Sequence, residues 1–366
     1  MVRFRHLDGT LDQLSLDTIK RIVVRAPNWV GDAVMSVAAF RKLRALFPNA
    51  HITVVSKPGT ADLFRDADFV DEVLVYERRA LPSFWQQVRE WKQRRFELAL
   101  LFQNAFEGAV MSFLARVPWR IGYDTERRGL LLTHPVAMPS WKNERHEIFY
   151  YLNLVAQLER ALLGRQSQEG EPQFQITVSE ERKNEARKLL ADAHVDADKR
   201  LVLLCPGSVN SRAKRWPAER YAALADLLAE SEATVVLIGS PGELEVSNEV
   251  ASLAKRPPVL LTGKTSVAGV TALISIADLL ITNDTGPAHI GAAVGTPTLV
   301  IFGPTNPLTT RPYGSTGQII RRPPDCAPCM LRDCPIDHRC MTAITPEEVL
   351  QQTAAQLIRR REEVPV

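Results

Sequence analysis

The stretch LLITNDTGPAHIGAAVGTPTLVIFGPT, residues 279–305, contains an apolar run, a helix-length segment and a second apolar run. The first run ends at Asn283–Asp284. Thr285, Gly286 and Pro287 then supply residue types with which helices commonly begin. A strand, a helix and a second strand in this order are typical of a parallel sheet covered by helices. The stretch therefore predicts an α/β fold.

The same alternation extends on both sides of this stretch. In the second half, strands are expected at 200–207, 233–240, 259–263, 278–284 and 296–303, and helices at 216–230, from about 242, near 266–276 and at 285–294. In the first half, strands are expected at 22–26, 51–56, 70–76 and 96–102, and helices at about 32–46, near 59–66 and at 82–95. Both halves therefore read as doubly wound parallel sheets.

The polar segment LGRQSQEGEPQ, residues 163–173, has no periodicity and is the best candidate for a linker. We expect four regions: an N-terminal extension (1–20), a first Rossmann-like domain (21–170), a second (171–344) and a C-terminal helix (345–366). Thr345 and Glu348 form a capping-box pattern at the start of that helix. Two such domains are expected to bind ligand at the carboxyl ends of their strands, facing a central cleft.

Composition narrows the class of protein. The chain has 366 residues, 45% hydrophobic and 24% charged, with a net charge of +3, as in a soluble globular protein. Residues 1–170 carry 24 Lys and Arg against 19 Asp and Glu, a balance of +5, and no nucleic-acid-binding motif accompanies this excess. No apolar run approaches the roughly 18 residues of a transmembrane helix. We expect a cytoplasmic protein that does not bind nucleic acid.

The turn after Asp284 is a candidate anion site. The free N–H groups of the first helical turn and the helix dipole favour an anion, Gly286 allows close approach, and the Thr285 hydroxyl can donate to a phosphate oxygen. His289 lies one turn further on the same face. A plain N-cap at Asp284 and a packed histidine are the competing interpretation; the position after a strand favours the anion site.

Two further segments follow strands of the second half. In CPGSVNSRAKRWP, residues 205–217, Gly207 and Ser208 suit a tight turn beside an anion, and Lys214 supplies charge, although a solvated basic loop would look the same. In VVLIGSPGELE, residues 235–245, Glu243 or Glu245 could accept hydrogen bonds from ribose hydroxyls.

The first half has its own turn of this kind, PNWVGDAVMS, residues 27–36. It contains a single glycine, Gly31, and then Asp32, a carboxylate where a phosphate loop would have none. Asp32 could cap the following helix, as aspartate often does. It could also act as a general base at the carboxyl end of the first strand.

These three segments, NDTGPAHIGAAVGTPTLVIFGPT, PGSVNSRAKRWP and PNWVGDAVMS, resemble the signature segments of the bacterial ADP-heptose:lipopolysaccharide heptosyltransferases, glycosyltransferase family nine. The resemblance spans about residues 20–360 and implies the two-domain GT-B fold. The W-V-G-D and A-K-R-W-P forms look most like the branch that adds the second heptose of the inner core. The implied donor is ADP-heptose, and the implied acceptor is lipid A bearing Kdo and one heptose, at the inner membrane surface.

The resemblance also implies residue roles. The donor-binding positions match Ser208, Lys214, Glu243, Asp284, Thr285, Gly286 and His289. The general base matches Asp32, which implies direct displacement with inversion through an oxocarbenium-like transition state. Replacing Asp32 with Asn would keep a capping oxygen and remove the base.

Acceptor contacts are expected from the basic first half, with Arg78, Arg79, Arg127 and Arg128 as candidates. The segment SFWQQVREWKQRR, residues 83–95, sets Phe84, Val88 and Trp91 at helical spacing beside basic residues. A helix packed on the sheet and contact with a membrane surface explain it about equally well.

No catalytic metal is expected. The Asp-x-Asp pairs Asp66/Asp68 and Asp196/Asp198 do not follow strands and read as loop charges. Four of the five cysteines, Cys326, Cys329, Cys334 and Cys340, fall in CAPCMLRDCPIDHRC. Their spacing is compatible with a structural zinc or iron–sulfur site or with a reduced thiol cluster.

Other functions remain open at this point. A nicotinamide or flavin oxidoreductase is disfavoured because no G-x-G-x-x-G follows either leading strand. A non-catalytic sugar-nucleotide binding protein is disfavoured by Asp32. Heptosyltransferase I or III of the same family also fits, because acceptor loops cannot be decoded from one sequence.

Overall fold

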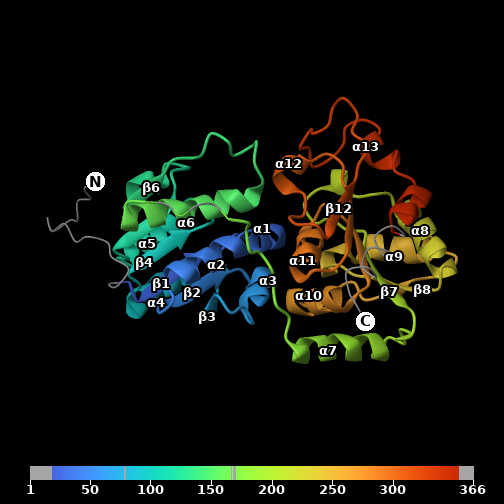
Figure 1. Ribbon diagram of the computed structural model, residues 1–366, viewed down its shortest axis with the longest axis horizontal. Helices are drawn as coiled ribbons and strands as arrows, with labels where there is room; N and C mark the ends of the chain where they lie inside the picture. Colours follow the sequence, from blue (N-terminus) through green and yellow to red (C-terminus); the bar gives the residue numbers. More distant parts are fainter. Residues whose placement is uncertain (1–18, 78–79, 166, 168–169, 354–366) are drawn as a thin grey trace. The chain divides into compact units, whose positions relative to one another are not determined.

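The computed structural model describes residues 19–77, 80–165, 167 and 170–353. The chain divides into two compact units, residues 1–174 and 175–366, and the division falls just after the segment expected to be a linker. Each unit contains a six-stranded, all-parallel sheet with helices on both faces (Figure 1). The predicted α/β class is confirmed in both halves.

The sheet of the first unit has the order β3-β2-β1-β4-β5-β6. Its strands are β1 (Arg21–Arg25), β2 (His51–Ser56), β3 (Glu72–Val75), β4 (Leu98–Leu101), β5 (Trp119–Tyr123) and β6 (His134–Val136). Its helices are α1 (Val30–Met35), α2 (Val37–Leu46), α3 (Pro58–Ala61), α4 (Leu81–Arg94), α5 (Phe106–Leu114) and α6 (Glu147–Leu163), with the 3-10 turns η1 (Asp62–Phe64) and η2 (Arg128–Leu131).

The sheet of the second unit has the order β9-β8-β7-β10-β11-β12. Its strands are β7 (Arg200–Cys205), β8 (Ala233–Leu237), β9 (Val259–Leu260), β10 (Leu279–Asn283), β11 (Thr298–Ile301) and β12 (Gly317–Ile320). Its helices are α7 (Glu180–Asp192), α8 (Ala218–Glu230), α9 (Leu244–Leu253), α10 (Val267–Ile276), α11 (Gly286–Val294), α12 (Pro307–Thr310) and α13 (Arg339–Thr342), with η3 (Arg212–Lys214) and η4 (Pro241–Glu243). Residues 346–353 are helical.

The strand order reverses at the centre of each sheet, between β1 and β4 in the first unit and between β7 and β10 in the second. At such a switch point the connections after the two central strands leave in opposite directions and open a crevice at the carboxyl edge. The loops after β1, β7 and β10 carry most of the residues singled out by the sequence, and Glu243 follows β8. The topology of each unit therefore explains why candidate residues lie after its central strands.

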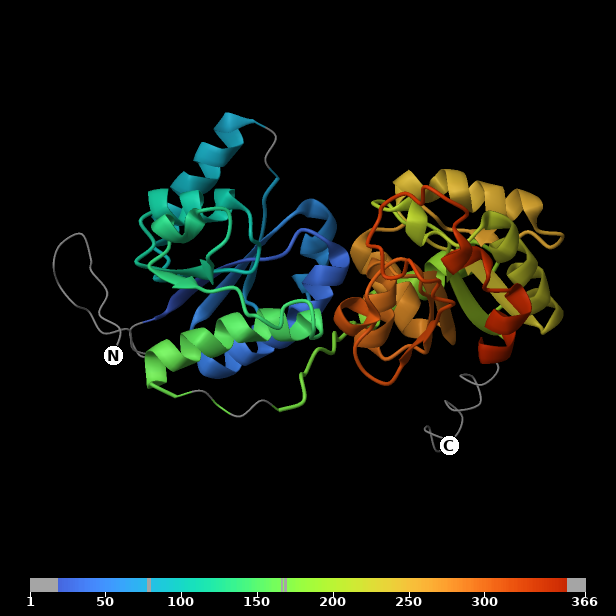
Figure 2. The same ribbon diagram turned by 90° about the horizontal axis from the view of Figure 1, so that it is seen from above.

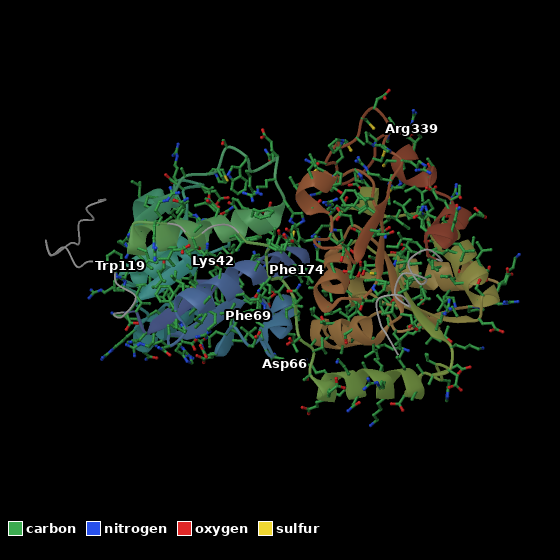
Figure 3. All side chains as sticks on the ribbon, in the orientation of Figure 1. Lys42, Asp66, Phe69, Trp119, Phe174 and Arg339 are labelled. Atoms are coloured by element: carbon green, nitrogen blue, oxygen red, sulfur yellow. The ribbon has the colours of Figure 1, made fainter. Side chains whose placement is uncertain are left out.

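Helices cover the sheet of the first unit in two layers: α2 and α6 pack together, as do α4 and α5 (Figure 2). Lys42, labelled in Figure 3, pairs through its ammonium group with Glu159 at 3.0 Å and ties α2 to α6. Phe84, Val88 and Trp91 are buried in the core, so this face of α4 packs on the sheet, one of the two interpretations the sequence allowed.

One predicted helix differs from the structure. The segment 32–46 is two helices, α1 and α2, which meet at Ser36. The Ser36 hydroxyl donates to the Ala33 carbonyl at 2.7 Å, an alternative partner that serine can offer the backbone within a helix. The short α1 keeps Asp32 in its first turn. Among the residues that the structure describes, no helix combines the length and apolar character needed to span a bilayer.

Candidate active site

The carboxyl ends of β7 and β10 are joined by Asn283, which is completely buried. Its side-chain nitrogen donates to the carbonyls of Pro206 at 2.8 Å and Gly207 at 3.1 Å. Its side-chain oxygen accepts from the Trp216 backbone N–H and the Tyr221 hydroxyl, both at 3.1 Å. A buried amide with all these groups satisfied holds the two loops in one arrangement.

Lys214 lies where these loops meet. Its ammonium group donates to the Asp284 carboxylate at 2.9 Å and to the Asp284 carbonyl at 3.1 Å. The same carboxylate oxygen accepts from the Thr305 hydroxyl at 2.6 Å. The Asp284 side chain is 3% exposed and that of Lys214 is 24% exposed. A buried carboxylate therefore fixes a cation that still reaches solvent beside the start of α11.

The N-terminus of α11 has no side-chain cap. Its N-cap residue is Thr285, not Asp284, and the Thr285 side chain accepts no hydrogen bond from the first turn. The Thr285 hydroxyl instead lies 3.3 Å from the Asn283 carbonyl. This contradicts the interpretation of Asp284 as a plain N-cap. First-turn amides without a side-chain cap, next to a lysine, are groups that can bind an anion.

The structure distinguishes the two glutamates near the end of β8. Glu243 is buried and its carboxylate accepts from the Ser240 N–H at 2.7 Å and hydroxyl at 2.8 Å, whereas Glu245 is exposed. Gly207 lies against Glu243, and a Cβ added there would lie 2.1 Å from its Oε1. Only glycine lets the carboxylate reach the end of β7.

The remaining expected donor residues are Ser208 and His289. Both are buried, at 3% and 6% exposure. The Ser208 carbonyl accepts from two nitrogens of the Arg215 guanidinium, at 2.9 and 3.2 Å, which closes the loop after β7. His289 lies on α11 one turn from Thr285, and its contact with the donor stays a prediction.

In the first unit, Asp32 lies in the first turn of α1, after β1. The hydroxyl of Tyr151, on α6, donates to Asp32 Oδ1 at 3.2 Å. Tyr151 is buried, and burial followed by the charge of Asp32 raises its pKa well above the ordinary value, so it remains a donor. The carboxylate is half-buried and oriented by a neutral hydroxyl, as expected of a proton acceptor.

The loop before Asp32 is held by Arg25, at the end of β1. Its guanidinium donates to the carbonyls of Ala26 and Val55 and to Asn28 Oδ1, at 3.1–3.2 Å. Burial lowers the pKa of Arg25 to about 10, which still leaves it charged at neutral pH. The start of the turn that carries Asp32 is therefore held by an arginine that the sequence analysis did not single out.

The arginines expected to contact the acceptor differ in their exposure to solvent. Arg128 is fully buried, and its guanidinium donates to the carbonyls of Tyr123 and Gln103 and to Asn104 Oδ1. This contradicts a surface role for Arg128: it cross-links the ends of β4 and β5, because a buried guanidinium needs its donors satisfied. Arg127 is exposed. Arg78 and Arg79 lie outside the described residues.

The cysteine segment braces the loop that carries Lys214. The Ala213 N–H donates to the Arg332 carbonyl at 2.9 Å, and His338 Nε2 lies 2.7 Å from the Ala213 carbonyl. Cys326, Cys329, Cys334 and Cys340 are all free thiols. Burial, with the neighbouring thiols adding to it, raises the pKa of Cys340 to about 11. Within the described part of the chain, no three His, Cys, Asp or Glu side chains are placed to hold a metal ion.

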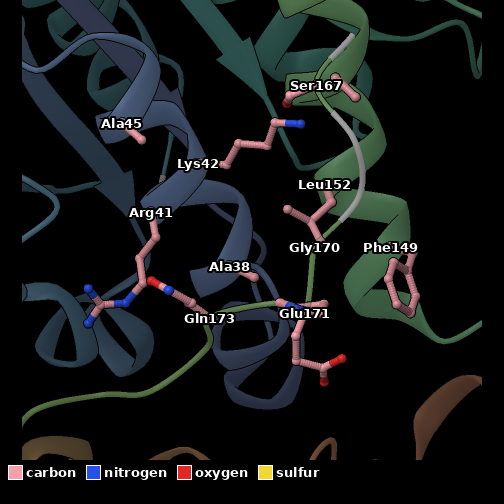
Figure 4. A pocket seen from close by; sticks show the side chains of 12 residues that line it. Ala38, Arg41, Lys42, Ala45, Phe149, Leu152, Ser167, Gly170, Glu171 and Gln173 are labelled. Atoms are coloured by element: carbon pink, nitrogen blue, oxygen red, sulfur yellow. The ribbon is translucent and has the colours of Figure 1, made fainter.

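A separate pocket of about 270 Å³ lies between α2 and α6 of the first unit (Figure 4). Arg41 and Lys42 line one wall and Phe149 and Leu152 the other. No candidate donor residue lines it, and neither does Asp32. It is therefore distinct from the site built around β1.

The sequence did not single out Asn283, Thr305 and Tyr151 for a role. Asn283 is the last residue of β10, and Thr305 lies close to the end of β11, so their place at the carboxyl edge was the available signal. Tyr151 is one apolar-face residue of a long helix, and only its contact with Asp32, 119 residues away, distinguishes it.

Comparisons with known proteins show the family and the fold of the chain. The family model for "Glycosyltransferase family 9 (heptosyltransferase)" matches residues 83–339. Lipopolysaccharide heptosyltransferase 2 of Salmonella typhimurium is 28% identical over 362 residues, covering 91% of this chain and 97% of that protein. The solved structure of ADP-heptose lps heptosyltransferase II of E. coli superposes with a TM-score of 0.80 at 26% identity, covering 93% of this chain and 99% of that one. An E. coli heptosyltransferase solved with ADP shares the fold, with a TM-score of 0.67 at 18% identity over 92% of this chain and 99% of that one.

Proposed function

The chain belongs to glycosyltransferase family 9, and from this premise we propose that it transfers L-glycero-D-manno-heptose from ADP-heptose to the inner core of lipopolysaccharide. The proposed acceptor is heptosyl-Kdo2-lipid A, which receives its second heptose. One observation carries the proposal: at one switch point Lys214 lies beside a helix start that has no side-chain cap, and at the other the Asp32 carboxylate accepts a hydrogen bond from Tyr151.

The second unit is proposed to bind the donor. The amides of Thr285 and Gly286 and the ammonium group of Lys214 would take the diphosphate, whose negative charge grows as the sugar departs. Glu243 would accept from the ribose, with Ser208 and His289 completing the pocket. Groups already held in place need little reorganisation when that charge develops.

The first unit is proposed to activate the acceptor. Asp32 would take the proton of the acceptor hydroxyl while its oxygen bonds to the anomeric carbon and the bond from that carbon to the phosphate breaks. The products are the glycoside, ADP and a protonated Asp32. Attack from the face opposite the leaving group inverts the configuration, and Tyr151 would keep Oδ1 oriented throughout.

The acceptor is proposed to be presented at the cytoplasmic face of the inner membrane. On α4, Leu81 and Trp85 are 64% and 54% exposed, one turn apart, and the exposed Arg89 and Lys92 follow. Apolar and basic side chains on one exposed helical face suit an anionic lipid surface. Arg127, and Arg78 and Arg79 outside the described residues, remain proposed contacts for acceptor phosphates.

We propose that the transfer needs no metal, since Lys214 and the helix N-terminus supply the positive charge that the diphosphate requires. The four thiols within residues 326–340 are of the type that binds zinc, but no three His, Cys, Asp or Glu side chains of the described residues are placed to hold a metal ion, so we propose no structural zinc there.

The proposed function is tested by measuring the mass of the transfer product. The protein is incubated with ADP-heptose and, in turn, with acceptors bearing no heptose, one heptose or two. A single added heptose on the one-heptose acceptor is expected. Transfer only to another acceptor would reassign the chain to heptosyltransferase I or III, and donor binding without any transfer would favour the non-catalytic binding protein.

A further inference from the structure

Side chains from three strand ends of the second unit meet at one carboxylate oxygen. Lys214 follows β7, Asp284 follows β10 and Thr305 follows β11, and these strands are neighbours in the sheet. The Lys214 ammonium group and the Thr305 hydroxyl both donate to Asp284 Oδ2, at 2.9 and 2.6 Å. Thr305 therefore shares its acceptor atom with the cation of the proposed donor site.

The two donors to this oxygen differ in burial and stiffness. Thr305 is 5% exposed, like the 3% exposed Asp284, whereas the Lys214 side chain is 24% exposed. A threonine side chain is short and restricted at χ1, while a lysine ammonium group sits on a flexible four-carbon stem. The buried hydroxyl is thus the more rigid partner of the carboxylate, and the carboxylate in turn holds the lysine.

The cysteine segment also links the backbone of the loops after β7 and β11. The Met330 N–H donates to the Pro304 carbonyl at 2.9 Å, one residue before the threonine. The Ala213 N–H donates to the Arg332 carbonyl at 2.9 Å, one residue before the lysine. The hydroxyl and the ammonium group therefore belong to two loops that the same short segment joins.

We propose that Thr305 is a positioning residue that, through Asp284, keeps the Lys214 ammonium group where the diphosphate of the donor binds. A buried carboxylate needs hydrogen-bond donors because water does not reach it. With the hydroxyl in place, Asp284 is satisfied without drawing the cation inward. Without the hydroxyl, Asp284 would gain its missing donor by turning toward Lys214 and would hold that cation away from the ligand. This rests on the proposed function of the second unit as the donor site.

The test compares Thr305→Val with Thr309→Val. Both variants remove the hydroxyl of a buried threonine, and the Thr309 hydroxyl donates only to the backbone, at the Asn306 carbonyl, 3.0 Å away. In Thr305→Val the Kd of ADP is expected to rise about fivefold to tenfold, while the Kd of adenosine, which has no phosphate, should stay unchanged. Thr309→Val should change neither.

Ligand-observed NMR, which detects weak binding, measures both affinities. An unchanged Kd of ADP in Thr305→Val overturns the proposal. So does an equal loss of adenosine binding in that variant, because a loosened fold would weaken both ligands, or an equal loss of ADP binding in Thr309→Val.

A double-mutant cycle tests whether Thr305 acts through Lys214. In a Lys214→Met background, adding Thr305→Val should leave the Kd of ADP unchanged, because the cation that the hydroxyl positions is gone. If Thr305→Val weakens ADP binding by the same factor with and without Lys214, the two residues act independently and the proposal fails.

A second pair of variants does not depend on Thr305→Val being folded. Thr305→Ser keeps the hydroxyl and should bind ADP about as tightly as the wild type, whereas Thr305→Ala should show the loss. Equal affinities of these two variants for ADP overturn the proposal. If the wild-type protein binds ADP but transfers heptose to no acceptor, the proposed transfer fails and these affinities still decide the inference.

Discussion

At the scale of single residues, the aspartates Asp284 and Asp32 have different hydrogen-bond partners in the two units. Asp284 is buried and neutralised by Lys214, so its role is to hold a cation in place. Asp32 accepts a hydrogen bond from the hydroxyl of Tyr151, which is a neutral donor. A carboxylate bound directly to lysine is a poor proton acceptor, and one held by a neutral donor is a better one.

Replacing Asp32 with Asn tests the base. The amide oxygen can still accept from Tyr151 but cannot take a proton, so kcat should fall by about 10²–10⁴-fold. The affinity for ADP, measured by calorimetry, should stay unchanged because the donor residues lie in the other unit. Asp196→Asn, an exposed position, is the control. Near-wild-type transfer by Asp32→Asn would reject the assignment.

At the scale of elements, strand ends and helix starts position the site. α11 begins with Gly286 and Pro287 and ends at Val294, and its C-cap residue Gly295 has a φ of 78°, in the left-handed region that glycine tolerates. Its first-turn amides lack a side-chain cap, and the loop after β7 approaches it through Asn283. The proposed donor site therefore depends on two strand–helix connections rather than on one motif.

Replacing Gly207 with Ala tests the connection after β7. The new Cβ would lie 2.1 Å from Glu243 Oε1 and displace the carboxylate from the end of the strand. We expect the free energy of unfolding to fall by about 1–3 kcal/mol, with weaker ADP binding in calorimetry. Gly242→Ala is the matched control, because its nearest outside atom is 4.0 Å away. Equal effects of the two variants would contradict the role of Gly207.

The exposed face of α4 is tested with vesicles. Leu81→Ser with Trp85→Ser should abolish cosedimentation with vesicles of phosphatidylethanolamine and phosphatidylglycerol, because insertion of apolar side chains supplies much of the binding of an interfacial helix. Leu308→Ser, at a residue 66% exposed in the second unit, should bind as the wild type does. Wild-type binding by the double variant would exclude α4 as the docking face.

At the scale of the whole molecule, the chain repeats one architecture. Both sheets have the strand order 3-2-1-4-5-6 of a doubly wound fold, and each unit has candidate residues at its own switch point. The GT-B fold class predicted from the sequence is confirmed, since two sheets of this kind superpose on solved heptosyltransferases. The two units are thus alike in fold and differ in the charge of their loops.

Removal of metal ions tests whether the second unit can neutralise the diphosphate of the donor without a metal ion. After treatment with EDTA, the initial rate of heptose transfer should stay within about twofold of the untreated rate, because Lys214 and the α11 amides carry the charge. Lys214→Met should lose activity in either condition. A rate that collapses with EDTA and returns with Mg²⁺ would contradict a metal-independent transfer.

The sequence by itself determined the α/β class, most strands to within a few residues, and the loops that carry Asp32, Lys214 and Thr285. Alternation of apolar strands with helices is local, and the residues that follow a strand sit at one edge of a parallel sheet whatever packs above them. The residues in these loops could therefore be identified as site candidates from the sequence alone.

Only the tertiary structure decided which side chains meet. It buried Arg128 and Glu243, exposed Glu245, joined Asn283 to the loop after β7, and brought Tyr151 to Asp32. The physical reason is that burial and partners depend on contacts between segments far apart in the chain. An arginine on the surface and one satisfied by backbone carbonyls look identical in sequence, and long-range packing alone distinguishes them.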